Sequence, residues 1–599
     1  MFQSIKILVL SLLFSLQFIQ AQGVQKYKIH SHNDYEQNIP FWSAYANGLN
    51  SIEADIFLKD NSLYVSHTES NIKKERTIEK LYLDPLQQVM ALKLGNQQAI
   101  QLLIDIKTEP VATLKKLIAV LETYPAVINN KNFSVVISGN RPEVKSYTQY
   151  PAYIQFDCQS LDSIPEKEQW EKVALISKSF HEFSSWNGKG RLTAEDYKKV
   201  SEAINKAHSY GKPFRFWGCP DSKTAWKTFK DLGVDFINTD MPYESSRYLN
   251  TLDSRVFYNT IASPVYTPTY LSDRKNSPVK NVILLIGDGN GLAQISSSVL
   301  ANGGQLTLTQ LKSIGFVKTQ SSDDFTTDSA AAGTALAIGQ KTYNRAIGVD
   351  SLGKPVENIM EILTKKGFST GVITTDRITG ATPASFYAHQ KERDLTAAIA
   401  NELTNSKISL FMGGGSVNFS AGFSNTDFII LDSLAAVAKS NKNQVGLFFS
   451  ENNVDSVLKG RENLLAEATK NGLEFLNAKN KPFFLMVEGA QIDSYGHANN
   501  VPGIVSEGID FDKAITEAIK YADKTGNTLV IVTADHETSG LSLPQGNLKE
   551  KMIEGDFTTY DHTGIMVPIF SYGPQSDIFS GVYGNNEVFH KIKQVLQLK

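Results

Sequence analysis

The 599-residue sequence contains only two cysteines, Cys158 and Cys219, and both lie in its first half. A fold held together by many disulfides is therefore excluded. One disulfide between the two cysteines stays possible if the strand ends that carry them are adjacent, which the sequence alone does not decide. The sequence also lacks an excess of either charge, since its 59 basic and 62 acidic residues give a net charge of −3. Nucleic-acid-binding proteins usually carry a strongly basic surface, so no nucleic-acid partner is expected.

The chain start has no apolar run long enough to span a membrane, because its run covers only residues 7–14. Lys6 precedes this run and a small-residue site ends at Ala21, a pattern typical of a secretory signal peptide over residues 1–21. No cysteine lies near Ala21, which disfavours a lipoprotein. The sequence therefore predicts a periplasmic or secreted protein without a stable membrane anchor.

The length exceeds one hydrophobic core and predicts at least two domains. Residues 24–250 repeat a rhythm of a strand followed by a helix. The expected strands are residues 27–32, 51–58, 63–67, 101–107, 133–138, 152–157, 173–179, 213–218 and 235–239. About eight such units predict a (β/α)8-type barrel, in which functional side chains lie at the C-terminal strand ends.

Residues 251–278 contain three Xaa-Pro pairs and little periodicity, which is typical of an extended linker between domains. The second domain, residues 279–599, contains long apolar runs that predict the buried strands of a mostly parallel sheet. Residues 403–480 carry few chemical motifs and are predicted to form a peripheral insertion. The expected fold class is α/β, with a barrel followed by an α/β/α sandwich.

Four segments of the second domain place metal-binding side chains together, and in the first three an apolar run comes directly before them. Open α/β sheets bind ligands beyond the carboxyl ends of their strands, so these side chains are expected to meet. Histidines mixed with carboxylates indicate a multinuclear metal site. The residues are Asp288, Glu488, Asp493, His497, Asp535, His536, Asp561 and His562. For Asp493 and His497 alone, a surface ion pair on one helix face is the competing interpretation.

Ser329 precedes a run of small residues, as suits a helix start with exposed backbone N–H groups. A serine hydroxyl needs a base or a metal to become a strong nucleophile. No separate Ser-His-Asp pattern is evident, so a neighbouring zinc ion would serve. Taken alone, the motif favours a helix cap, whereas the surrounding metal-binding clusters favour a nucleophile.

Six motifs occur in the order found in alkaline phosphatases, and the resemblance covers most of residues 279–599. They are Ile286-Gly-Asp288-Gly, Thr327-Asp-Ser329-Ala-Ala-Ala-Gly, Ala381-Thr382-Pro-Ala, Glu488-Gly-Ala-Gln-Ile-Asp493 with His497, Thr533-Ala-Asp535-His536 and His562-Thr-Gly. The resemblance implies an alkaline-phosphatase-type sandwich that hydrolyses small phosphate monoesters through a phosphoserine on Ser329. Arg393 would bind the phosphate oxygens.

The resemblance also implies two zinc ions and one magnesium ion. One zinc would be held by Asp493, His497 and His562, the other by Asp288, Asp535 and His536, and the magnesium by Asp288, Thr382 and Glu488. Gly380 and Ser494 depart from the family pattern, since many relatives carry an acid or histidine at the first position and lysine or histidine at the second. Both departures bear on magnesium affinity and the pH optimum. A homodimer is one expected assembly, unless the barrel obstructs that surface.

Short motifs of the first domain resemble the superfamily of glycerophosphodiester phosphodiesterases and phosphatidylinositol phospholipases C. They contain His32, Glu53-Ala-Asp55, His67, Asp105-Ile-Lys107 and Phe216-Trp217. The resemblance implies one divalent cation, Mg²⁺ or Ca²⁺, on Glu53, Asp55 and Asp105, with His32 and His67 as general acid and base. Asn33 replaces the usual arginine and Asp105 is a shorter carboxylate than usual, so an inactive barrel retained for binding is the alternative to cleavage of glycerophosphodiesters.

Two further function classes remain as alternatives. A sulfatase or nucleotide phosphodiesterase could use the same sheet, but the Cys/Ser-x-Pro-x-Arg setting of sulfatases is absent around Ser329, and nucleotide phosphodiesterases usually offer threonine. The non-enzymatic alternative is an exported binding protein with an inactive barrel. Release of phosphate by the metal-loaded protein would separate this alternative from the phosphatase.

Overall fold

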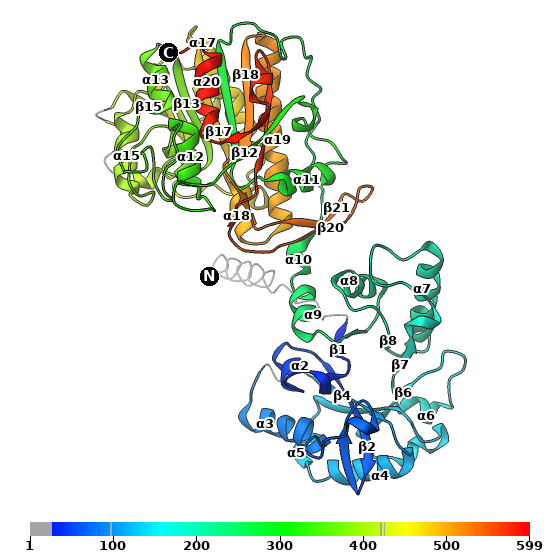
Figure 1. Ribbon diagram of the computed structural model, residues 1–599. Helices are drawn as coiled ribbons and strands as arrows, with labels where there is room; N and C mark the ends of the chain where they lie inside the picture. Colours follow the sequence, from blue (N-terminus) through cyan, green and yellow to red (C-terminus); the bar gives the residue numbers. More distant parts are fainter. Residues whose placement is uncertain (1–26, 96–98, 420–421, 425, 599) are drawn as a thin grey trace, which may run out of the picture. The chain divides into compact units, whose positions relative to one another are not determined.

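The computed structural model describes residues 27–95, 99–419, 422–424 and 426–598, which form two units divided between Leu252 and Asp253 (Figure 1). The predicted signal peptide, residues 1–21, lies outside the described residues. Within the described part of the chain, no helix combines the length and the apolar character that crossing a membrane requires.

The N-terminal unit is a closed barrel of eight parallel strands, as predicted. The first strand pairs with both the second and the last, which closes the ring. The barrel strands are β1 (Lys28–Ser31), β2 (Ser51–Lys59), β4 (Ile100–Ile106), β5 (Phe133–Gly139), β6 (Ile154–Cys158), β7 (Val173–Ser179), β8 (Phe214–Trp217) and β9 (Phe236–Thr239). The expected strand at residues 63–67 is β3 (Ser62–Val65), which pairs antiparallel to β2 outside the ring.

Helices between the barrel strands begin and end at local sequence signals. Helix α4 (Pro110–Leu121) begins at Glu109, whose carboxylate accepts hydrogen bonds from two backbone N–H groups of the first turn. Helix α7 (Ala194–Ser209) begins at Thr193, whose hydroxyl accepts one hydrogen bond from the Asp196 N–H group, and helix α8 (Lys223–Leu232) ends at Gly233, which has a φ of 88°. Their apolar faces are buried in the unit's core.

The C-terminal unit contains a ten-stranded, mostly parallel sheet, as predicted. Its order is β15-β16-β14-β13-β17-β11-β18-β23-β12-β24, and β23 runs antiparallel to its neighbours β18 and β12. The strands are β11 (Asn281–Gly287), β12 (Ser313–Lys318), β13 (Ser369–Arg377), β14 (Leu410–Gly414), β15 (Phe428–Leu431), β16 (Gln444–Phe448), β17 (Phe483–Gly489), β18 (Thr528–Ala534), β23 (Val567–Tyr572) and β24 (Gly581–Gly584).

Two hydrophobic cores lie on the two faces of this sheet, which makes the unit a three-layer sandwich. Along β11, Val282 and Leu284 belong to one core and Ile283 and Leu285 to the other, because successive side chains of a strand point to opposite faces. The first core includes residues of α12 (Ser329–Ile338), α13 (Ile359–Lys365) and α20 (Glu587–Val595), and the second those of α11 (Leu292–Ala301), α17 (Leu464–Ala478) and α19 (Val501–Thr525).

The prediction that residues 403–480 form a peripheral insertion is wrong. This stretch supplies β14, β15 and β16, which extend one edge of the central sheet, and helix α17, which packs on it. No candidate metal group among the described residues includes a side chain of this stretch, so the sequence offered no chemical motif there. Residues 256–258 of the expected linker form β10 (Val256–Tyr258), which pairs antiparallel with β21 (Met552–Asp556) of the C-terminal unit.

The two cysteines do not pair in the structure. Cys158 and Cys219 are both free thiols. Burial raises the pKa of Cys219 to about 12, so this thiol stays protonated and unreactive at neutral pH.

Candidate active site

Three adjacent parallel strands bring the predicted ligands to one edge of the C-terminal sheet. Strand β11 lies between β17 and β18, with Ile286 opposite Glu488 and Gly287 opposite Ala534. Asp288 directly follows β11, and Asp535 and His536 follow β18. Because the strands are parallel, residues more than 200 positions apart in the sequence meet at the same edge.

The first candidate metal group consists of Asp288, Asp535 and His536, whose ligand atoms all lie within 4.8 Å of one another. His536 Nε2 lies 3.3 Å from Asp288 Oδ1 and 3.3 Å from Asp535 Oδ2. Both of these carboxylate oxygens are buried and accept no hydrogen bond. Leaving buried charged oxygens without partners is costly, and a bound cation would supply the missing partner. The residues therefore fit a zinc ion.

The second candidate group is formed by Asp493 and His497 of α18 (Gln491–His497) together with His562. His562 Nε2 lies 3.1 Å from His497 Nε2, and the two rings lie 3.5 and 3.4 Å from the carboxylate of Asp493. The Nδ1 atoms contact backbone carbonyls, at 2.6 Å from Tyr560 for His497 and 2.8 Å from Thr327 for His562. This arrangement fixes Nδ1 as the donor and leaves Nε2 free to bind a metal.

The side chains that lie closest together do not match in full the zinc ligand sets that the family resemblance implies. Asp493, His536 and His562 form one such group, and His497, Asp561 and His562 form another. His536 and His562 stack with their ring centroids 3.5 Å apart, which joins the two candidate metal groups into one centre. Asp561 was quoted in the sequence motif but not assigned a role.

Charge and burial in this centre favour bound cations. Burial and neighbouring carboxylates raise the pKa of Asp535 to about 7, and they raise that of Asp288 well above its ordinary value. Burial, assisted by the charge of His562, lowers the pKa of His536 to about 3, so its ring is neutral, as metal binding requires. Several buried carboxylates with raised pKa values are typical of a site that normally holds positive charge.

Glu488 and Thr382, the other implied magnesium ligands, are also buried beside the centre. Thr382 belongs to α14 (Ala381–Ala384), and the hydroxyl of Thr374 donates a hydrogen bond to Glu488 Oε2. Burial first, and then the charge of Asp376, raises the pKa of Glu488 to about 8. A hydroxyl beside carboxylates is a donor set that suits magnesium.

Ser329 is the first residue of α12, and its hydroxyl is not used to cap that helix. The cap is Asp328, whose side chain accepts a hydrogen bond of 2.9 Å from the Ala331 N–H group. The interpretation of Ser329 as a helix cap is therefore wrong. Its Oγ lies 3.3 Å from His536 Nε2, and Ser329 lines a cleft of about 320 Å³ together with Arg393, Asp493, His497 and His562.

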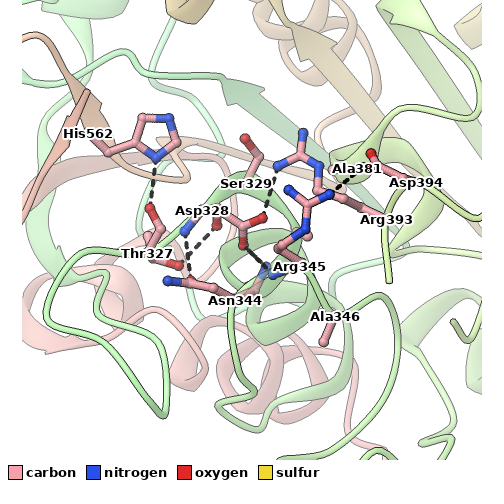
Figure 2. A network of polar contacts seen from close by, with 12 residues as sticks. Thr327, Asp328, Ser329, Asn344, Arg345, Ala346, Ala381, Arg393, Asp394 and His562 are labelled. Carbon is pink, nitrogen blue, oxygen red and sulfur yellow. Dashed lines mark hydrogen bonds and ion pairs between the residues drawn. The ribbon is translucent and has the colours of Figure 1, made fainter. Parts of the chain in front are cut away.

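Arg393 is held beside Ser329 by the same aspartate. Figure 2 shows Asp328 between the helix start and the guanidinium group, with Arg393 Nη1 3.0 Å from Asp328 Oδ2. Asp328 Oδ1 also accepts a hydrogen bond of 3.1 Å from the Arg345 N–H group. Asp328 was assigned no role from the sequence, and its position directly before a serine and a helix was the only available signal.

We expect Arg393→Ala to raise both KM and the inhibition constant of inorganic phosphate. Loss of a charge-assisted hydrogen bond costs about 1.5–3 kcal/mol, which corresponds to roughly a 10–150-fold weaker phosphate interaction. Steady-state kinetics with phosphate as a competing inhibitor measure both constants. Arg345→Ala is the matched control, because the Arg345 side chain pairs with Glu392 and Asp394 instead. Equal effects of the two substitutions would contradict the assignment of Arg393.

The barrel brings its three implied metal ligands together. Glu53 and Asp55 on β2 and Asp105 on β4 have ligand atoms within 4.8 Å of one another, and Asp55 Oδ1 is buried without a hydrogen bond. These residues fit a divalent cation. Lys107 also lies in this group, with Nζ 3.0 Å from Asp55 Oδ2 and 3.1 Å from Asp105 Oδ1.

The two histidines assigned to acid and base roles lie at the same end of the barrel. His67 Nδ1 is 3.4 Å from Asp55 Oδ2 and 3.0 Å from the Tyr35 hydroxyl. His32 Nδ1 is 2.8 Å from Asp240 Oδ1, just beyond the end of β9. Tyr35 and Asp240 were not singled out from the sequence.

A buried arginine of the barrel was also missed. Arg215 on β8 places Nη1 2.9 Å from Glu53 Oε2, and His30 Nε2 lies 2.8 Å from the same oxygen. Although burial opposes it, the charge of Arg215 holds the pKa of Glu53 well below its usual range. Burial followed by the charge of Glu53 raises the pKa of Asp55 to about 6. Arg215 therefore already partners one of the implied metal ligands.

Comparison with known families agrees with both resemblances. The alkaline phosphatase family model matches residues 279–429 and 431–552. In the N-terminal unit, the model of the AIM6-like phosphodiesterase domain matches residues 19–97, and that of the glycerophosphoryl diester phosphodiesterase family matches residues 213–243.

Individual relatives cover the C-terminal part of the chain. Alkaline phosphatase 4 of Bacillus subtilis (strain 168) is 31% identical over an alignment of 410 positions, which covers 53% of this chain and 89% of the relative. Alkaline phosphatase of Escherichia coli (strain K12) is 30% identical over an alignment of 416 positions, which covers 55% of this chain and 88% of the relative.

Solved structures show the same likeness. Alkaline phosphatase from the Antarctic bacterium TAB5 is 41% identical, covers 54% of this chain and all of its own, and has a TM-score of 0.52. A variant of that enzyme with magnesium bound in its M3 site is 42% identical, with the same coverage and TM-score. Through residues 279–599, this chain belongs to the alkaline phosphatase family and is a phosphomonoester hydrolase with an N-terminal phosphodiesterase-like barrel.

Proposed function

We propose that the C-terminal unit hydrolyses small phosphate monoesters through a covalent phosphoserine on Ser329. The observation that carries this proposal is the position of the Ser329 hydroxyl. It lies at the start of α12 but does not cap that helix, and its Oγ atom is 3.3 Å from His536 Nε2 in a cleft that Arg393 also lines. A nucleophile, an anion clamp and metal ligands thus share one cleft.

In the first half of the reaction, Ser329 Oγ attacks phosphorus, the ester P–O bond breaks and the alcohol leaves with a proton. Arg393, held by Asp328, binds the phosphoryl oxygens during this transfer. In the second half, water attacks phosphorus, the bond to Ser329 breaks and inorganic phosphate is released. When bound, the two zinc ions would lower the pKa of the attacking hydroxyl and stabilise the entering and leaving oxygens.

We assign the ligands as the family resemblance implies. Asp493, His497 and His562 hold one zinc, Asp288, Asp535 and His536 hold the second, and Asp288, Thr382 and Glu488 hold magnesium. Their convergence at one sheet edge and the unpartnered oxygens of Asp288 and Asp535 support this assignment. The magnesium-containing variant of TAB5 alkaline phosphatase supports a third metal position.

For the barrel, we propose that Glu53, Asp55 and Asp105 bind one Mg²⁺ or Ca²⁺ ion and that the site cleaves glycerophosphodiesters, with His32 and His67 as acid and base. The grouping of the three carboxylates supports cation binding. The contact of Arg215 with Glu53 favours the alternative, a barrel that binds its ligand without cleaving it, because it places a fixed positive charge beside the cation position.

Tethering of the two units suggests a relay, in which the barrel cleaves a diester and the phosphatase removes phosphate from the resulting monoester. We therefore expect Ser329→Ala protein, supplied with glycerophosphodiester and Mg²⁺ or Ca²⁺, to accumulate glycerol phosphate. Wild-type protein should release inorganic phosphate instead. Product analysis by ³¹P NMR distinguishes the two products.

The control for this experiment is the double variant Ser329→Ala/Glu53→Gln, which should form neither product because the barrel loses a metal-binding carboxylate. If Ser329→Ala protein leaves the diester intact but still binds it, the barrel is a binding module and the relay is refuted.

We propose export from the cytoplasm and cleavage of the signal peptide after Ala21, on the pattern of residues 1–21. N-terminal sequencing of the protein recovered from outside the cytoplasm should begin at Gln22. The homodimer stays a prediction that light scattering of the full chain can test.

A further inference from the structure

The environment of Gly380 points to an unassigned member of the magnesium site. Gly380 precedes α14 with a φ of −60° and a ψ of 163°, a conformation that any residue can adopt. Glycine is therefore not required there by the backbone. The limit is space, because a Cβ atom on Gly380 would lie less than 3.0 Å from Asp376 Oδ2, and 3.0 Å from the carbonyl oxygen of Arg377. The Asp376 carboxylate occupies the volume that a side chain at position 380 would need.

One threonine links the backbone at Asp376 to the proposed magnesium ligand Glu488. The Thr374 hydroxyl accepts a hydrogen bond of 2.9 Å from the Asp376 N–H group and donates one to Glu488 Oε2. Thr374 and Glu488 are direct neighbours in the pairing of β13 with β17. Among the charged groups around Glu488, Asp376 has the largest effect on its pKa.

The local charge balance requires a cation. The buried Glu488 lies within electrostatic reach of the partly exposed Asp376 and of Asp288, whose Oδ1 is buried and accepts no hydrogen bond. Like charges at such sites are tolerated when positive charge lies between them. Among the described residues, neither Asp376 nor Glu488 belongs to a group of three carboxylate, histidine or cysteine ligands within 4.8 Å, and we assign Asp376 the outer position, in contact with the ion through water. Magnesium usually retains several water ligands.

We infer that Asp376 supplies the acidic group that many alkaline phosphatases carry at the position of Gly380, and that it binds the water ligands of the magnesium ion. This inference rests on the proposed magnesium site and adds a residue to it. In this chain the acid lies near the end of β13 instead of at the start of α14, and the glycine leaves room for it. The departure at Gly380 therefore does not remove the acid from the site.

The test is magnesium binding by the zinc-loaded full chain, measured by equilibrium dialysis and elemental analysis over a series of Mg²⁺ concentrations. Asp376→Asn and Asp376→Ala are expected to weaken magnesium binding by about 10–100-fold, the usual cost of losing an outer partner of a metal site. The zinc content should stay at the wild-type value. Asp427→Ala, which removes an exposed acid paired with Lys407, is the control and should change neither metal.

A relocated acid provides a stricter test. The double variant Asp376→Ala/Gly380→Asp should recover magnesium binding to within about threefold of wild type, since the backbone conformation at position 380 accepts a side chain and the Asp376 carboxylate no longer fills the space beside it. Gly380→Asp alone should not strengthen binding, because the new side chain would meet Asp376.

Unchanged magnesium affinity in both Asp376 variants would overturn the inference. Loss of zinc together with magnesium in Asp376→Asn would overturn it as well, since that result indicates a general structural role. If wild-type protein binds zinc but no magnesium at any concentration, the proposed magnesium site itself fails, and this outcome is distinguishable because it does not involve the variants.

Discussion

Ser329→Ala is expected to lower kcat for phosphate monoesters by at least about 10³-fold, because the variant has no oxygen at the position from which phosphorus is attacked. The metal ligands and Arg393 are untouched, so the variant should still bind inorganic phosphate within about threefold of wild type. A normal inhibition constant combined with a lost kcat would place the defect in the chemical step. Stopped assays with a chromogenic monoester give both quantities.

Ser296→Ala is the matched control for this substitution. Ser296 lies on α11, is partly exposed, and its hydroxyl bonds only to the backbone of Leu292 in the same helix, so its loss should leave kcat within about twofold. Activity of Ser329→Ala within tenfold of wild type would contradict the covalent route and indicate direct attack by water.

Removal of metal is expected to abolish phosphatase activity and to lower stability by an amount that grows with pH. In the metal-free protein, the raised pKa values of Asp535 (about 7), Glu488 (about 8) and His562 (about 9) mean that the folded state binds protons more tightly than the unfolded chain. The stability from these groups is present at low pH and is lost as pH rises through those values. His536, whose pKa is lowered, contributes fully above about pH 6.5 and does not reverse this trend.

The free energy of unfolding of the chelated protein should therefore fall between pH 6.5 and pH 9, by about 1.4 kcal/mol for each proton released over one pH unit. Bound cations replace the lost protons, so the metal-loaded protein should change far less over this range. Urea unfolding of chelated and reconstituted protein at both pH values measures the difference. A metal-induced stabilisation that is equal at pH 6.5 and pH 9 would contradict the proposed centre.

Reconstitution provides the control for metal removal. Activity should return with Zn²⁺ plus Mg²⁺, and Zn²⁺ alone should restore less, because the magnesium position remains empty. Adding back Ca²⁺ without Zn²⁺ should restore no phosphatase activity, since imidazole ligands do not suit calcium.

The sequence was sufficient to predict the strands and most of the centre for a simple topological reason. Buried parallel strands appear as apolar runs, and parallel strands end at the same edge of the sheet. Asp288, Glu488, Asp535 and His536 could therefore be assigned to one place from their positions after three such runs. The barrel followed in the same way from repeated strand and helix segments.

Contacts that depend on side-chain direction could not be predicted. The contact between Asp328 and Arg393 depends on the paths of two loops, which the sequence does not give. The contact of Arg215 with Glu53 joins two barrel strands through residues that are 162 positions apart. That the Asp376 carboxylate fills the space beside Gly380 can be seen only in the structure, because it depends on the direction of that side chain. Strands β14 to β16 were missed for another reason, since they extend the sheet without carrying ligands and so resemble any apolar segment.

The most direct test of the central claim is mass spectrometry of wild-type protein quenched with acid during turnover of a phosphate monoester. The account predicts that the peptide containing Ser329 gains the mass of one phosphoryl group and that Ser329→Ala protein gains none. A quenched wild-type enzyme that carries no phosphoryl group under rapid turnover, or carries it on another residue, would contradict the account.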